Sequence, residues 1–205
     1  MKKLLLSLAL MASYLGNAQD YLDKSIKKTD LSVIKKSLNN SSFEGFTSSD
    51  LNNWSVQSDA SSRIENGWYY YLVQTHQDIP VHGAIANVFV NNGTATVNNI
   101  GFVKDLASKV NSTSPSISEV EAIKKAAIEA GLNVPSQVKF QSKDELKKES
   151  TFASIEGTQS EVKVALMYEL VNQTDVKLVY VVNLNLSNGK HWWNISIDAS
   201  TGEFI

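Results

Sequence analysis

The chain has 205 residues, a formal charge of −2 at pH 7 and no cysteine. A charge this close to zero excludes the strongly basic surface that binds nucleic acid phosphates, so no nucleic acid partner is expected. The lack of cysteine excludes disulfide bonds and thiol chemistry. Packing of the apolar residues, which make up 42% of the sequence, must therefore stabilise the fold.

The first residues have the pattern of a secretory signal. Lys2 and Lys3 precede an apolar run at 4–12, and small residues follow as far as Ala18. The apolar run is shorter than the ~20 residues that cross a bilayer as a helix. We interpret residues 1–18 as a signal peptide, which predicts a secreted product, extracellular or periplasmic, without membrane contact after cleavage.

Residues 19–45 are predicted to form an N-terminal helix and a linker. Between Tyr21 and Leu38, apolar residues recur at roughly helical intervals among lysines. The Ser/Asn-rich stretch that follows is typical of a loop.

Residues 46–107 have the pattern of an antiparallel β-meander. Trp54 and Val56 alternate with polar residues, and Asn66-Gly67 predicts a tight hairpin turn. Asn91-Asn92-Gly93 predicts another, because Asn and Gly adopt the left-handed conformation at little cost. The expected strands are 68–75, 81–90 and 94–103.

A polar stretch at 108–116 marks the best internal boundary, and the second half is expected at 115–205. Ser118 and Glu121 have the spacing of a capping box, which predicts a helix that ends at Gly131. Alternating apolar residues then predict further strands, at 162–170, 178–186, 191–197 and the C-terminus. The expected fold class is α+β: an N-terminal helix, an antiparallel meander, then a helix packed on an antiparallel sheet.

No group of residues predicts a reaction. The three histidines, His76, His82 and His191, match no zinc-binding spacing, and no G-x-S-x-G nucleophile motif occurs. We therefore expect no catalytic residue, no metal and no cofactor in this chain. The tryptophans Trp68, Trp192 and Trp193 fit either core packing or an exposed surface for a sugar or a protein.

One stretch has a more specific meaning. The segment YLVQTHQDIPVHGAIANVFV at 71–90 resembles the fungalysin/thermolysin propeptide motif. The motif's positions are matched by Gln74, Ile79, Pro80, Val81 and Gly83. The sequence departs from the motif at Thr75, His76 and Asp78, where a second Gln, an aromatic residue and Gly are common.

Two later segments are similar to a PepSY region, which forms the second half of such prosegments. They are SISEVEAIKKAAIEAGL and HWWNISIDASTGEFI, of which the closing pattern is the more specific. The resemblance implies a propeptide-like half at 46–107 and a PepSY-like half at 115–205, with a PepSY/cystatin-like fold.

The resemblance also implies a function. Such segments precede a secreted zinc metalloendopeptidase, assist its folding and inhibit it until they are cleaved, so the expected partner is a metallopeptidase catalytic domain. Zinc is expected only in that domain, which this sequence does not contain. The candidate docking residues are Gln74, Ile79, Pro80, Val81, Gly83, Trp192 and Trp193. The alternatives are a free-standing inhibitor or binding module that acts in trans and, less favoured, a carbohydrate-binding module.

Overall fold

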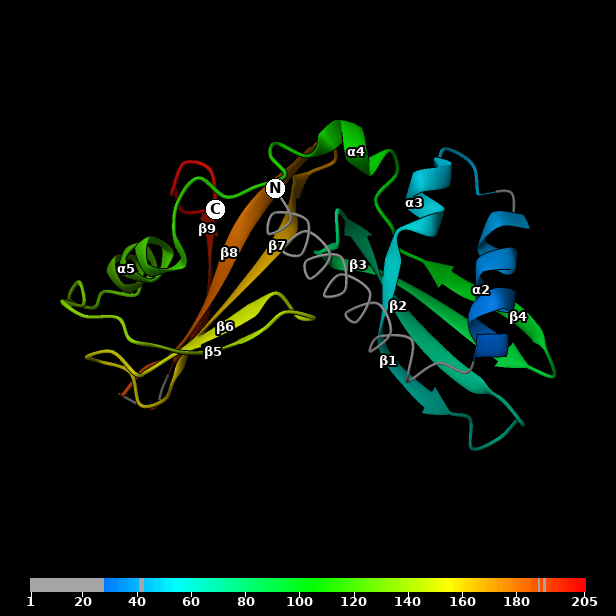
Figure 1. The fold of residues 1–205 in the computed structure, drawn as a ribbon, viewed down its shortest axis with the longest axis horizontal. Coiled ribbons are helices and arrows are strands. Elements are labelled where there is room, and N and C mark those ends of the chain that lie inside the picture. The colour runs from blue at the N-terminus through cyan, green and yellow to red at the C-terminus, as the bar shows by residue number, and fades with distance from the viewer. Residues whose placement is uncertain (1–27, 41–42, 188, 190) are drawn as a thin grey trace, which may run out of the picture. The chain divides into compact units, whose positions relative to one another are not determined.

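The computed structural model describes residues 28–40, 43–187, 189 and 191–205 (Figure 1). The predicted signal peptide at 1–18 and the start of the predicted N-terminal helix lie outside the described residues. The chain divides into two compact units. The first comprises residues up to Gln74 together with Gly83–Lys104, and the second comprises Thr75–His82 and Asp105–Ile205. In the part of the chain that is described, no helix is both long and apolar enough to cross a membrane.

The first unit is a twisted antiparallel sheet with a helix on it. Antiparallel pairing joins β1 to β2 and β3 to β4, and α2 packs against β4 (Figure 1). The elements are α2 (Lys28–Asn40), α3 (Ser48–Asn52), β1 (Trp54–Ser61), β2 (Trp68–His76), β3 (Ile79–Asn91) and β4 (Thr94–Ile100).

The helix α2 is held by both apolar and polar contacts. Ile34 and Leu38 are fully buried against the sheet. The Tyr70 hydroxyl of β2 donates a hydrogen bond of 2.7 Å to Asp30 of α2. Burial, and then this hydrogen bond, raise the pKa of Tyr70 above its ordinary value of 10.0, so the phenol keeps its proton further into alkaline pH than a free tyrosine.

Gln74 ties β2 to the segment after β4. Its side chain is fully buried. Its amide nitrogen donates to the Val103 carbonyl oxygen at 2.9 Å, and its amide oxygen accepts from the Val103 N–H at 2.7 Å. Both polar ends of a buried side chain are thus satisfied by one backbone position.

The hairpins that join β1 to β4 use three different connections. Asn92 and Gly93 both have positive φ, of 47° and 74°, which confirms the predicted turn between β3 and β4. The predicted tight turn at Asn66-Gly67 is wrong, because residues 62–67 form a wider connection between β1 and β2. Gly67 is needed there for another reason, since a Cβ atom would lie 2.5 Å from the Phe89 ring.

The hairpin between β2 and β3 has a two-residue connection without glycine. Gln77 and Asp78 have φ of 49° and 61°, as a two-residue type I′ turn requires. Each non-glycine residue in this conformation costs ~1 kcal/mol or more. Asp78, where the propeptide motif commonly has Gly, therefore preserves the turn but lowers the stability of the fold.

Strand β3 contains an irregularity at Gly83, whose φ is 73°. Before it, Ile79 and Val81 are buried; after it, burial shifts to the even-numbered residues from Ala84 onward. His82 and Gly83 are both exposed. One additional residue in the strand thus exchanges its two faces, as a β-bulge does.

The second unit consists of a sheet with helix α5 on one face. Antiparallel pairing gives the order β5-β6-β7-β8-β9, and Val81 at the start of β3 pairs in parallel with Tyr168 of β7. The elements are α4 (Leu106–Lys109), α5 (Glu119–Glu129), β5 (Phe140–Asp144), β6 (Glu149–Phe152), β7 (Val162–Asn172), β8 (Asp175–Asn185) and β9 (Trp192–Asp198).

Helix α5 begins where the sequence predicts. The Ser118 side chain accepts from the Glu121 N–H, and the Glu121 carboxylate accepts from the Ser118 N–H at 2.8 Å, which confirms the capping box. The hydrogen bonds from Ser118 lower the pKa of Glu121. The helix packs on β8 and β9 through a buried stripe, formed by Ala122, Ile123, Ala126 and Ala127.

The motif near the C-terminus is a turn built around one buried carboxylate. Asp198 is 1% exposed. One of its oxygens accepts from the Ser200 and Thr201 N–H groups, at 2.8 and 3.1 Å, and the other lies 3.4 Å from the Lys177 ammonium. Gly202, with φ of 75°, then returns the chain toward β9. The roles of Asp198, Thr201 and Gly202 in this turn are structural.

The predicted α+β class is wrong. The structure is mostly β, with 46% strand and 18% helix, and the nine described strands belong to one mixed sheet. The predicted PepSY-like fold, with a helix on a purely antiparallel sheet, does not describe a chain that is mostly strand and whose nine described strands form one mixed sheet. The difference comes from β5 and β6, two strands that the sequence does not predict, and from the parallel pairing of Val81 with Tyr168.

Replacing Gln77-Asp78 with Asn-Gly should stabilise the protein by about 1 to 2 kcal/mol, because Asn and Gly adopt the left-handed conformation more readily. Urea denaturation measures this as a higher midpoint at an unchanged slope. Gly93→Ala is the control in the opposite direction. No atom lies within 4 Å of the added Cβ, so the change causes no steric clash. Strain at the positive φ should nevertheless lower the urea midpoint. No gain from Asn-Gly would contradict the strained turn.

A second prediction concerns alkaline pH. Burial, with a smaller contribution from Glu119, raises the pKa of Tyr180 from 10.0 to about 12. The folded state therefore binds the proton more tightly, and stability should fall as pH rises from 10 to 12. The contribution of Tyr180 to this loss is about 2 kcal/mol. Urea midpoints across that range should decline less steeply in Tyr180→Phe than in the wild type, and equal slopes would contradict this prediction.

Candidate functional site

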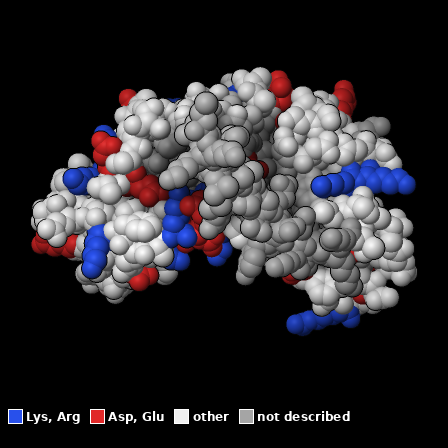
Figure 2. Space-filling model, viewed as in Figure 1, with Lys and Arg blue, Asp and Glu red and all other residues white. Residues whose placement is uncertain are grey.

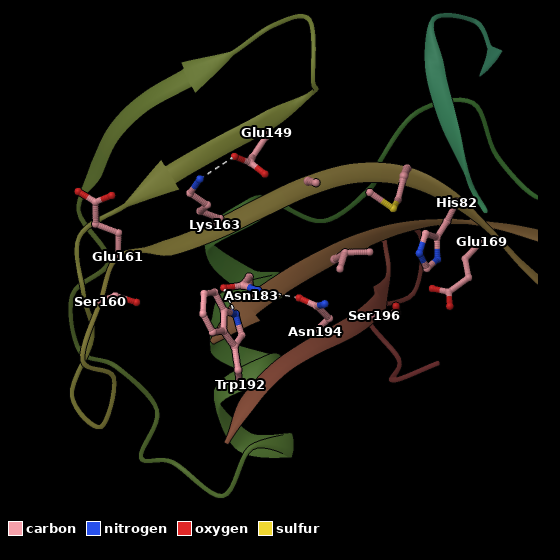
Figure 3. A pocket seen from close by; sticks show the side chains of 13 residues that line it. His82, Glu149, Ser160, Glu161, Lys163, Glu169, Asn183, Trp192, Asn194 and Ser196 are labelled. Carbon is pink, nitrogen blue, oxygen red and sulfur yellow. Dashed lines mark hydrogen bonds and ion pairs between the residues drawn. The ribbon is translucent and has the colours of Figure 1, made fainter. Parts of the chain in front are cut away.

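The second unit has one sheet face that α5 does not cover. Alternate residues of a strand point to opposite faces of the sheet. One set of strand residues packs against α5, and the other set points away from it. We call this second set, with His82 from β3, the open face. A hollow of about 730 Å³ lies over it, and Figure 3 shows its side chains converging from several strands. The strand residues at its centre are Lys163, Ala165, Met167, Glu169, Val181, Asn183, Trp192, Asn194 and Ser196.

Among the charged side chains of the open face, carboxylates outnumber lysines. Its carboxylates are Glu149, Glu161 and Glu169, and its lysine is Lys163. The Lys163 ammonium lies 3.3 Å from the Glu149 carboxylate, so this pair neutralises itself. Glu161 and Glu169 form no ion pair with any of the described residues.

Glu169 is the more unusual of the two. Its Oε2 atom is covered from solvent and has no hydrogen-bond partner in the described structure. His82 of β3 lines the same hollow (Figure 3). A covered acceptor without a donor is costly.

Trp192 is an exposed aromatic ring whose orientation is fixed. The residue is 69% exposed, and its indole N–H donates to the Asn183 side-chain oxygen at 2.7 Å. The Asn183 amide in turn donates to the Asn194 side-chain oxygen at 2.7 Å. Two hydrogen bonds in series thus hold a large flat apolar surface toward the hollow (Figure 3).

Trp193 is directed to the other face of the same strand. It is 45% exposed, and its ring stacks on His191 with centroids 5.4 Å apart. The two neighbouring tryptophans therefore serve different surfaces, and only Trp192 lines the hollow.

The structure separates the other predicted docking residues from this site. Gln74 and Val81 are fully buried and Ile79 is 7% exposed, so their side chains hold the fold. Pro80 is partly buried and Gly83 is exposed. Of the segment 74–83, only His82 contributes a side chain to the open face.

Charged groups are intermingled on the visible surface, which also has wide uncharged areas (Figure 2). The open face therefore cannot be found from net charge. Its sequence signal was the polar side of the alternating strands, where Lys163, Glu169 and Asn183 occur. Sequence reasoning assigned that side to solvent and missed Glu161, Asn194 and the cross-strand contacts.

Comparison with known proteins does not assign the chain to a family: no family model matches it, and no curated protein matches it. Within the described residues, no three His, Cys, Asp or Glu side chains gather closely enough to hold a metal ion.

The hydrogen bond from Trp192 to Asn183 can be tested directly. Asn183→Ala should leave the free energy of unfolding nearly unchanged, because the site is exposed, but it should speed exchange of the Trp192 indole proton with water. NMR of the four indole N–H groups measures this. The Trp54 indole, bonded to the Leu51 carbonyl, is the internal reference. An unchanged Trp192 exchange rate would show that the contact does not fix the ring.

Proposed function

We propose that the chain acts as the prosegment of a secreted zinc metalloendopeptidase of the fungalysin type, as an intramolecular chaperone and inhibitor of its catalytic domain. That domain lies outside the given sequence. The resemblance of residues 71–90 to the propeptide motif supports the proposal from the sequence. The open face supports it from the structure.

The observation that carries the proposal is the fixed, exposed ring of Trp192 on an uncovered sheet face. Tryptophans of this kind frequently dominate the binding energy of protein interfaces. Because two hydrogen bonds already orient the ring, little side-chain entropy is lost on docking. A broad face of several strands matches the surface of a folded partner better than a single small substrate.

The same physics accounts for both proposed roles. A segment that binds the folded catalytic domain more tightly than the unfolded one favours folding by mass action. A covalent connection supplies an effective concentration on the order of millimolar, so modest contacts suffice. Cleavage of the connection removes that advantage and releases the enzyme.

The first test is genetic. The coding DNA beyond Ile205 should contain an in-frame His-Glu-x-x-His motif within a few hundred codons. A stop codon there would instead favour the free-standing inhibitor that acts in trans.

The second test is biochemical. The purified protein should inhibit the cognate metallopeptidase and raise its refolding yield, and Trp192→Ala should weaken inhibition at least about tenfold, as expected for a central interface tryptophan. Trp193→Ala, on the opposite face of β9, is the matched control and should change it less. Absence of both inhibition and folding assistance by the wild type would refute the proposed function.

A further inference from the structure

We propose that the outer edge of β9 is a docking site for an extended polypeptide segment of the partner, which adds to the sheet as a further strand beside Trp192 and Asn194. The inference rests on the proposed function for the partner being the metallopeptidase. It adds the mode of contact and the chemistry of the contacting segment.

The position of β9 leaves one of its edges open. Among the nine described strands, β9 pairs only with β8. The Leu186 N–H donates to the His191 carbonyl oxygen at 3.0 Å, so the backbone groups of His191 point to β8. In an antiparallel strand, the backbone groups of alternate residues point to the same side. Those of Trp193 therefore also point to β8, and those of Trp192 and Asn194 point away from it.

The C-terminal residues show that the outward side of β9 accepts a strand. The Asp198 N–H donates to the Glu203 carbonyl oxygen at 2.8 Å, and the Ile205 N–H donates to the Ser196 carbonyl oxygen at 3.0 Å. Residues 203–205 thus lie antiparallel to the end of β9. The outward backbone groups nearer the start of β9 form no such bond with the described residues.

A polypeptide strand is the occupant that matches this edge. The outward N–H and C=O groups recur at every second residue, a spacing of ~6.8 Å. Another strand presents acceptors and donors at the same spacing, whereas a sugar or a single side chain satisfies one group at a time. Strand addition is a recurring way of binding extended peptides, in which main-chain hydrogen bonds supply affinity and side-chain contacts supply specificity.

The edge also lacks the features that usually protect an edge strand. Charged side chains and bulges normally discourage pairing with another chain. β5, the edge strand on the other side of this unit, carries Lys143 and Asp144, each of which is in an ion pair. The segment 192–197 contains no charged residue, and its pairing with β8 contains no bulge.

Exposed tryptophans on both sides of the edge set the side-chain chemistry of the occupant. Trp192 is on the open face and Trp193 is on the opposite face, and both are exposed. Aromatic side chains pair favourably across strands with β-branched and aromatic residues, which also favour the strand conformation. The docking segment should therefore be uncharged at its centre, free of proline and rich in Val, Ile, Thr or aromatic residues.

The first measurement needs no ligand. In the purified protein, the backbone amide protons of Trp192 and Asn194 should exchange with water at least about tenfold faster than those of Trp193 and Ile195, which point to β8. Equal protection would show that the edge is not free. Protection of Asn194 that rises with protein concentration would show that a second copy of the chain occupies the edge. Either result would overturn the inference.

The second measurement uses the blocked peptide acetyl-Lys-Thr-Val-Thr-Val-Lys-amide, with the backbone amide NMR signals of Trp192 and Asn194 as the readout. The peptide should shift both signals saturably. The control peptide is N-methylated at its four central residues, which removes their N–H donors and keeps the charge and side chains. It should bind at least about tenfold more weakly. Equal binding of the two peptides would overturn the inference, as would no saturable shift at peptide concentrations on the order of millimolar.

Two variants at one position connect the edge to inhibition. Asn194→Pro removes the outward N–H and places a ring carbon there, which an edge strand tolerates. Asn194→Ala keeps the N–H and, like the proline variant, loses the hydrogen bond from Asn183. Asn194→Pro should inhibit the metallopeptidase at least about tenfold less tightly than Asn194→Ala, because its ring blocks the added strand. Circular dichroism melting confirms that each variant is folded, and the peptide comparison needs no substitution.

The proposed function and the inference can fail separately. If folded Asn194→Pro inhibits the metallopeptidase as well as Asn194→Ala does, the inference fails and the proposed function stands. If the unmethylated peptide binds the edge as expected but the wild type neither inhibits nor assists folding of the metallopeptidase, the strand-binding edge stands and the proposed function fails.

Discussion

The packing of α5 on one face of β8 and β9 is the interaction on which the second unit depends. The buried stripe of α5 is rich in alanine, so the helix approaches the sheet closely and covers the even-numbered residues of β8. The two-residue period of a strand then leaves the opposite residues for another purpose. Trp192, Asn183 and Asn194 are on that side, where their contacts can be optimised for a partner without disturbing the core.

Much of the local structure could be predicted from the sequence, because it depends on neighbouring residues. The capping box of Ser118 and Glu121 and the turn at Asn92-Gly93 are set by side chains within a few positions of each other. The fold class could not be predicted in the same way. The hairpin of β5 and β6 has little apolar alternation, and nothing local to Val81 indicates that it pairs in parallel with Tyr168.

The candidate site shows the same division between local and distant information. Trp192 was a candidate from its residue type alone, and the structure adds the hydrogen bonds that fix its ring. The predicted loop residues behave differently: Ile79 and Val81 are buried, and burial rather than contact with a partner accounts for them. Glu161 and Glu169 line the same hollow as Trp192 only once the chain has folded, because they precede it by more than twenty residues.

The bulge at Gly83 has a consequence for how this sequence can change. Ile79 and Val81 contribute to the core of one unit, whereas the buried even-numbered residues after Gly83 contribute to the core of the other. Because of the additional residue, each set faces the core of its own unit along one continuous strand. Loss of a single codon at this point would turn one set outward, so insertions and deletions here should be tolerated far less than substitutions, even though the position is on the surface.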